Sequence, residues 1–253
     1  SIRNQAQDYE SIKSVTFTGV KKERSNAQAK PMPWDISNFD FNYSFSQISN
    51  HDPIIEKDEE DIYKGGFNYN YARQTKYISP FKKLIKNDKH IKFLSQFNFN
   101  PIPSSFSFST GLDRRYNTRN FRFSTPEFGQ SITRLFYWDR KYNLNWDLSQ
   151  SLKFSFNAST NSAIDELPIM DRIGRLDPTY DPELNKKKIW DGIKSLGRPK
   201  NYMHTYTANY TLPTRVMPVL DWVQVTAQAN GTYGWVAGSQ NVVDFLHNVM
   251  QNS

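Results

Sequence analysis

The sequence predicts an all-β fold, namely a segment of an antiparallel transmembrane β-barrel that is incomplete without the rest of its parent chain. Residues 39–46 alternate rings with small polar or acidic side chains, and this alternation returns at least five more times; a period of two gives a strand two different faces. Aromatic residues make up 15% of the 253 residues, yet the mean hydropathy is −0.73, so aliphatic residues for a soluble core are few. No apolar run approaches the roughly 20 residues of a membrane helix, so any span must consist of strands.

Short alternating runs, bounded by Gly, Pro or charged residues, predict the individual strands. In chain order the predicted strands are residues 15–18, 39–48, 67–71, 97–100, 106–109, 138–148, 152–158, 202–210 and 223–235. Short connections at 149–151 and 213–218 predict two antiparallel hairpins. Pro101 and Pro103 predict a tight turn, because proline cannot donate a hydrogen bond to a neighbouring strand.

The connections between these strands are charged or irregular. An acidic loop is expected over residues 51–61, and Gly65-Gly66 is expected to break the chain before the next strand. Apolar spacing within residues 80–92 predicts a short amphipathic helix, and residues 161–200 predict a long loop with one helical turn near 189–196. Solvated connections are also expected to hold the basic runs Lys82-Lys83, Arg114-Arg115 and Lys186-Lys187-Lys188.

The organisation expected from these elements is one large barrel wall over residues 1–240, followed by a short tail. The tail, residues 241–253, has near-helical apolar spacing and is either a short helix or a piece joined across a gap in the chain. Because the sequence begins at Ser1 without an initiator methionine or a signal peptide, we expect a processed or partial piece of a longer protein.

The content of the two strand faces favours a membrane barrel over a soluble sandwich. Within the predicted strands the polar side is mostly Asn, Ser, Thr and Gln, and charged residues are expected near the strand ends. Tyr and Trp also gather near those ends, as in the aromatic girdles of outer-membrane barrels. The residues predicted to face lipid or the girdle are Phe39, Phe41, Tyr43, Phe45, Phe67, Tyr69, Tyr71, Trp138, Tyr142, Trp146, Phe154, Phe156, Tyr206, Tyr210, Tyr233 and Trp235. Those predicted to face the lumen are Asn42, Ser44, Asn68, Asn70, Asn143, Asn145, Ser155 and Asn157.

Motifs for catalysis or metal binding are not found in the sequence. The four histidines are scattered without ligand spacing, and there is no cysteine, so no thiolate site or disulfide is possible. Two acidic groups, residues 58–61 and 177–183, could supply oxygen ligands to Ca²⁺, but neither follows an EF-hand pattern and solvated loops are the simpler interpretation. We therefore expect no enzyme activity, no cofactor and no metal; the net charge of +7 permits contact with anionic lipid, and no nucleic-acid partner is expected.

Five segments together resemble one protein family. They are residues 9–14, 65–71, 97–106, 144–148 and 233–235, of which the turn Asn100-Pro101-Ile102-Pro103-Ser104-Ser105 is the most specific. Over most of residues 9–240 the chain resembles the SprA/Sov family, the outer-membrane translocon of the type 9 secretion system of Bacteroidetes. The family chain is far longer, so the resemblance covers one part of a barrel.

What the resemblance implies is a wall segment of a protein-conducting channel in the cell outer membrane, which exports folded proteins and supports gliding motility. The implied partners are outer-membrane lipid, the remainder of the parent barrel, a PorV-type barrel, a periplasmic plug protein and secreted protein substrates. Two other interpretations stay open at this point. One is a porin-like or nutrient-receptor barrel, and the other is a soluble β-rich module that binds carbohydrate through exposed rings.

Overall fold

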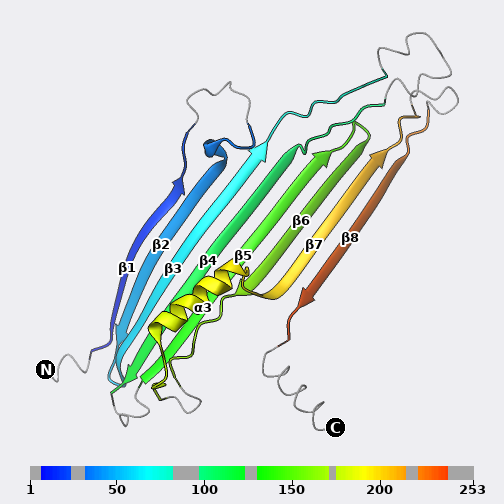
Figure 1. The fold of residues 1–253 in the computed structure, drawn as a ribbon. Helices are drawn as coiled ribbons and strands as arrows, with labels where there is room; N and C mark the ends of the chain where they lie inside the picture. Colours follow the sequence, from blue (N-terminus) through cyan, green and yellow to red (C-terminus); the bar gives the residue numbers. More distant parts are fainter. Residues whose placement is uncertain are drawn as a thin grey trace, which may run out of the picture.

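The computed structural model describes residues 7–23, 32–81, 97–122, 130–170, 175–214 and 222–238. Within them, eight antiparallel strands form one sheet in which every strand pairs with its neighbours along the chain (Figure 1). The strands are β1 (Tyr9–Val20), β2 (Phe39–His51), β3 (Ile55–Ala72), β4 (Ser105–Phe121), β5 (Gln130–Asp147), β6 (Leu152–Ala163), β7 (Arg198–Thr211) and β8 (Thr226–Val236). The short 3-10 helix η1 (Ile36–Asn38) precedes β2, and helix α3 (Pro182–Lys194) lies between β6 and β7. The predicted antiparallel β-structure is confirmed.

The strand register places rings of neighbouring strands on the same face. Phe41 lies opposite Phe67, Tyr69 opposite Phe108, and Phe108 opposite Tyr142. Because side chains alternate between the two sides of a strand, one face collects the rings and the other the small polar groups. We call the face with the rings the aromatic face. In β2, β3 and β8 it consists of the odd-numbered residues, within 39–51, 57–71 and 227–235. In β4, β5, β6 and β7 it consists of the even-numbered residues, within 106–120, 130–146, 152–162 and 202–210. The intervening residues form the polar face.

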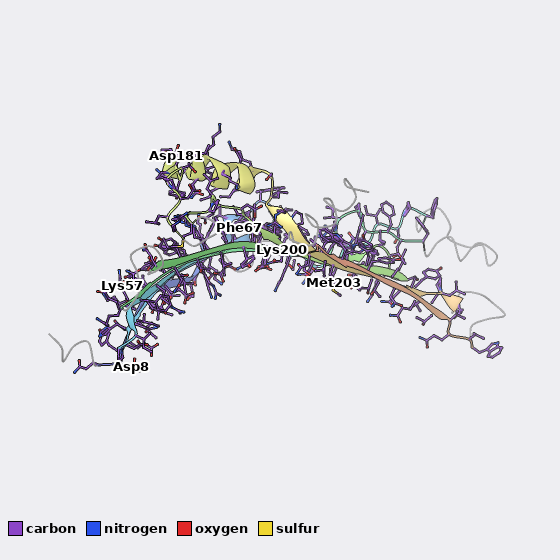
Figure 2. All side chains as sticks on the ribbon, turned by 90° about the horizontal axis from the view of Figure 1, so that it is seen from below. Asp8, Lys57, Phe67, Asp181, Lys200 and Met203 are labelled. Carbon is purple, nitrogen blue, oxygen red and sulfur yellow. The ribbon has the colours of Figure 1, made fainter. Side chains whose placement is uncertain are left out.

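The sheet is curved and open. Figure 2 shows an arch with α3 over its convex side. Among the described residues, β1 pairs with β2 alone and β8 with β7 alone, so the sheet does not close on itself.

The strands of the sheet are staggered. Strand β5 pairs with β4 over residues 130–145 but with β6 only over 137–147, so the later strands are displaced along the strand direction. Closure of any barrel requires a stagger of this kind.

Two charged stretches that were expected to be connections lie inside strands. The acidic residues 58–61 belong to β3, which contradicts the loop predicted over 51–61, and Arg114-Arg115 lies within β4. Charge compensation between neighbouring strands explains both errors. Arg119 Nη2 on β4 lies 2.7 Å from Asp58 Oδ2 on β3, and opposite charges across a strand pair stabilise it. Gly65-Gly66 is also inside β3, so the predicted chain break there is wrong.

The long loop predicted over residues 161–200 contains more regular structure than expected. Strands β6 and β7 occupy its two ends, and the helix spans 182–194 instead of a single turn near 189–196. Asp181 caps that helix, because its Oδ1 accepts a hydrogen bond from the Glu183 backbone N–H at 2.9 Å, and Pro182 suits a first helical turn. The run Lys186-Lys187-Lys188 therefore lies on α3.

The remaining predicted elements differ from the structure at their boundaries. The strand predicted over 15–18 extends over the whole of β1. The strand predicted over 97–100 is wrong, since Phe99 makes a single bridge with Ile78. Both predicted hairpins are confirmed, as β5 pairs with β6 and β7 with β8. Lys82-Lys83, most of the helix predicted over 80–92 and the 241–253 tail lie outside the described residues.

One glycine on the aromatic face lies beneath a ring. A Cβ added at Gly231 would lie 2.5 Å from Cζ and the hydroxyl oxygen of Tyr206, its cross-strand neighbour. We expect Gly231→Ala to force this ring aside and to destabilise the sheet by about 1 kcal/mol, the low end for overpacking. A denaturant midpoint measures the change, with Gly65→Ala as control, because a Cβ there meets nothing within 4 Å. An equal loss in a Tyr206→Ala background would contradict this explanation.

Candidate functional site

The aromatic face is the most distinctive surface of the described molecule. All sixteen residues predicted to meet lipid or the girdle lie on it, and all eight predicted lumen residues lie on the polar face. Rings contact one another across strands, with centroid distances of 5.2 Å for Phe41 and Phe67 and 5.0 Å for Phe108 and Tyr142. Strand β1 adds Tyr9 and Phe17, which lie opposite His51 and Tyr43 of β2. The structure thus joins rings from eight strands, β1 to β8, into one surface.

The rings occupy only part of each strand's length. On β5 they run from Phe136 to Trp146, which is ten residues or about 34 Å along a strand. We call this zone the aromatic band; it ends on β3 at Tyr63. Beyond Phe136 the same face of β5 carries Arg134, and beyond Tyr63 it carries acidic residues. A strand tilted by about 40° gives the band a height of about 26 Å, close to the roughly 25 Å apolar zone of outer-membrane barrels.

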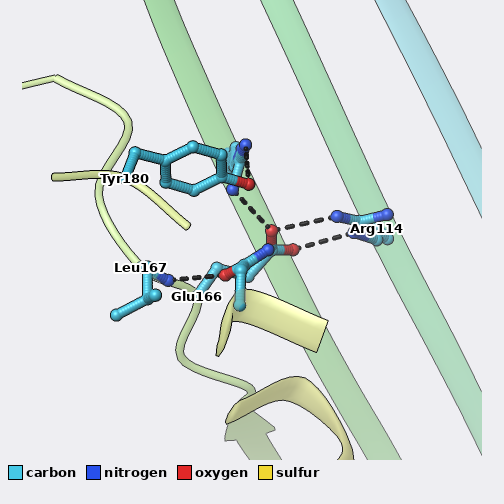
Figure 3. A network of polar contacts seen from close by, with 6 residues as sticks. Arg114, Glu166, Leu167 and Tyr180 are labelled. Carbon is cyan, nitrogen blue, oxygen red and sulfur yellow. Dashed lines mark hydrogen bonds and ion pairs between the residues drawn. The ribbon is translucent and has the colours of Figure 1, made fainter. Parts of the chain in front are cut away.

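The charged zone beyond the band binds residues 164–197, a segment that connects β6 to β7. Figure 3 shows Glu166 of this segment at the centre of the contact. Its side chain is only 6% exposed. It accepts hydrogen bonds from Arg114 Nε at 2.8 Å and Arg114 Nη2 at 2.9 Å, and from Arg134 Nη1 at 3.2 Å. Two strands are therefore attached to the segment through one carboxylate.

Further contacts extend this attachment. Arg134 Nη2 donates to the Tyr180 hydroxyl at 3.0 Å, and the guanidinium lies 5.1 Å from the centre of that ring. Asn185 on α3 is buried and its Oδ1 accepts a hydrogen bond from the Leu167 N–H at 2.7 Å (Figure 3). Helix α3 is thereby fixed over the aromatic-face side of the sheet.

The electrostatics of Glu166 agree with this role. Burial raises the pKa of the carboxyl, but the Arg114 hydrogen bond and the positive charges of Arg114 and Arg134 outweigh burial, so the pKa lies below its usual range. The ionised form is thus favoured in the folded state. Nearby, Asp165 pairs with Arg198 at 2.8 Å, but both side chains are 40% exposed or more, and such pairs contribute little.

Arg140 lies inside the band, where the attached segment contacts it. Its side chain is buried, it donates to Ser162 Oγ at 2.8 Å and to the Leu196 carbonyl at 3.0 Å, and its guanidinium lies 4.9 Å from the centre of the Trp138 ring. The sequence contained a signal for this contact that we missed. A charged residue within the row Trp138, Arg140, Tyr142 indicates that the surroundings of the face change there.

The polar face carries ladders of short amide and hydroxyl groups. Asn143 Nδ2 donates to Ser107 Oγ at 3.0 Å, and Asn145 Nδ2 to Ser105 Oγ at 3.0 Å. These bonds satisfy the amide groups between neighbouring strands. The prediction that charges stay near strand ends is wrong on this face, because Lys64, Asp113 and Arg115 lie well within β3 and β4 and are paired with one another.

The acidic residues 58–61 do not converge on a common point. Asp58 and Glu60 lie on the polar face, whereas Glu59 and Asp61 lie on the opposite face and both accept hydrogen bonds from Gln47 Nε2 at 3.1 Å. Within the described ranges, no group of three or more His, Cys, Asp or Glu side chains is placed to hold a metal ion.

The described part of the chain also contains no helix long and apolar enough to cross a membrane. Of the four histidines, His51 and His204 are described. His204 lies among rings: its ring centroid is 5.4 Å from that of Tyr202 and 5.4 Å from that of Tyr233.

No protein-family model matches the sequence, and no curated protein shows significant similarity to it.

Proposed function

We propose that this chain is a wall segment of a large outer-membrane β-barrel that conducts proteins across the membrane. The observation that carries the proposal is one continuous aromatic band across β1 to β8, backed by a polar face rich in short amide and hydroxyl groups, whose charges at Lys64, Asp113 and Arg115 are paired. Water on both sides would leave this band as a large exposed apolar patch, which soluble proteins rarely have. A bilayer on one side and an aqueous lumen on the other suit both faces.

The exposure of individual rings supports contact with lipid. On the aromatic face Phe41 is 53% exposed, Tyr206 44% and Tyr233 55%. Such rings lack enough neighbours in this sheet to remove them from water. In an outer-membrane barrel they meet lipid tails near the middle of the wall and headgroups at its borders.

The open edges and the gentle arch support a large barrel. In lipid, the unpaired backbone groups of β1 and β8 would each cost several kcal/mol, so further strands must pair with them. An arch of eight strands whose ends stay apart (Figure 2) belongs to a barrel of more strands, and barrel diameter grows with strand number. A wide lumen is what passage of a folded protein requires, and the resemblance to the translocon family suggests that cargo.

Labels on two adjacent residues test the wall. Tyr43 and Ser44 of β2 belong to opposite faces, so single variants Tyr43→Cys and Ser44→Cys of the native polypeptide, each carrying a fluorophore, form a matched pair. In phospholipid nanodiscs we expect quenchers on lipid tails to quench the label at 43 and a water-soluble quencher to reach the label at 44. Quenching of both labels by the aqueous quencher alone would contradict a membrane wall.

The same pair tests conduction. A photo-crosslinker at position 44 is expected to capture secreted proteins in living cells, while one at position 43 captures none. The mass of the native polypeptide is the control for barrel size, because a parent of ordinary receptor size is too short for a protein-conducting barrel. In that outcome the labels would still report a wall, but not one that conducts folded proteins.

A further inference from the structure

Helix α3 has two chemically different sides. Asn185, Ile189, Gly192 and Ile193 are at least partly buried toward the sheet, and a Cβ at Gly192 would lie 3.1 Å from Cγ2 of Ile164. The opposite side is exposed. It carries Lys187, Trp190 and Lys194, whose spacing of three and four residues aligns them along one stripe of the helix.

The exposed stripe combines a large ring with positive charge. Trp190 is 62% exposed, which is unusual for a tryptophan that does not take part in an interface. The helix contains four lysines against two acidic residues, Glu183 and Asp191. One lysine, Lys186, pairs with Glu183 at 2.7 Å. Asp191 lies four residues after Lys187 and three before Lys194, so the stripe has two lysines against one neighbouring carboxylate and keeps a net positive charge for an external anion.

Helix α3 lies across the border of the aromatic band. Its C-terminal end leads into Leu196, whose carbonyl is held by Arg140 inside the band. Tyr180, just before the helix, contacts Arg134, which lies beyond the border ring Phe136 of β5. Figure 2 shows α3 over the convex side of the arch. If the band meets lipid tails, the helix lies at the level of the headgroups.

We propose that α3 is an interfacial anchor whose Lys187, Trp190 and Lys194 rest on anionic lipid headgroups at one border of the bilayer. This inference rests on the proposed membrane wall and adds a lipid preference to it. Ammonium groups bind phosphate oxygens, and tryptophan favours the headgroup layer because its ring is apolar and its N–H is polar. A lipid surface is favoured over a protein partner because the stripe adjoins the band and its charge is opposite to that of anionic lipid.

A label near the stripe tests the anchor. Asp191→Cys places a fluorophore on α3 and keeps Trp190 and every lysine. In nanodiscs of phosphatidylcholine mixed with phosphatidylglycerol, we expect quenchers at the headgroup level to act more strongly than quenchers deep in the tails. Phosphatidylglycerol carrying the quencher should act more strongly than phosphatidylcholine carrying it. Each of Lys187→Gln and Lys194→Gln should lower this preference about fivefold, the effect of one lysine near an anionic surface.

The label at position 43 separates the possible failures. If the label at 43 meets lipid tails and the label at 191 meets water only, the anchor is wrong and the wall stands. If neither label meets lipid, the wall itself is wrong. Equal quenching by the two lipids would overturn the headgroup assignment, and so would a preference for phosphatidylglycerol that survives both lysine changes. A co-purified protein that covers the label in place of lipid would also overturn it.

Discussion

Replacing Glu166 with alanine is expected to release residues 164–197 from the sheet. The change leaves Arg134, whose side chain is only 14% exposed, and the more exposed Arg114 without their shared carboxylate. Removing one member of a buried ion pair is costly because the remaining charge stays desolvated. Since Arg114 is 37% exposed and solvent screens it, we expect a loss of about 2–4 kcal/mol in the free energy that holds the segment on the sheet.

Hydrogen exchange and limited proteolysis of the native protein measure this release. Amides of α3 should exchange about 30-fold to several hundred-fold faster in the variant, while amides of β4 and β5 change little. Asp165→Asn is the matched control, because its partner Arg198 is exposed and the pair contributes less than about 1 kcal/mol. Equal exchange in the two variants would show that Glu166 does not hold the segment.

Strand alternation predicted the two faces because the period of two is a local property. The sorting of Phe39, Phe41 and Asn42 needs no knowledge of which strand lies alongside. The short connection between β5 and β6 then fixed their pairing. The pairing of β7 with β8 was also predicted correctly, although residues 212–225 form a longer connection than the one predicted over 213–218. This is why the candidate surface was identified residue by residue, although its boundaries along each strand were not.

The charged half of the sheet was not predicted because its partners are distant in sequence. Arg114 and Glu166 are 52 residues apart, and Asp58 and Arg119 are 61 apart. Without knowledge of the pairing, a run such as 58–61 looks like a solvated loop. The helical turn predicted near 189–196 lacked the N-terminal half of α3 for a different reason. Asp181-Pro182-Glu183 is also a turn sequence, and its value as a helix start depends on the cap that Asp181 forms.

Replacing Tyr142 with arginine is expected to destabilise the protein in a bilayer far more than replacing its neighbour Asn143. Tyr142 lies midway between Trp138 and Trp146 on the aromatic face of β5, and Asn143 lies on the polar face. Arginine at the lipid-facing middle of a barrel wall costs about 2–4 kcal/mol, whereas a lumen position tolerates it. Guanidinium unfolding of the native polypeptide in liposomes gives the two free energies.

Two controls separate the free-energy cost of placing a charge in lipid from the cost of losing the packing of the tyrosine ring. The rings of Tyr142 and Phe108 are in tilted contact with their centroids 5.0 Å apart, so Tyr142→Ala measures how much stability the ring contact provides. Only the excess loss in the arginine variant reports the effect of the membrane. That excess should disappear in detergent micelles, whose water and headgroups reach a long arginine side chain. A larger loss at Asn143 would mean that the polar face is the enclosed one, and an excess that persists without lipid would assign the band to a protein partner.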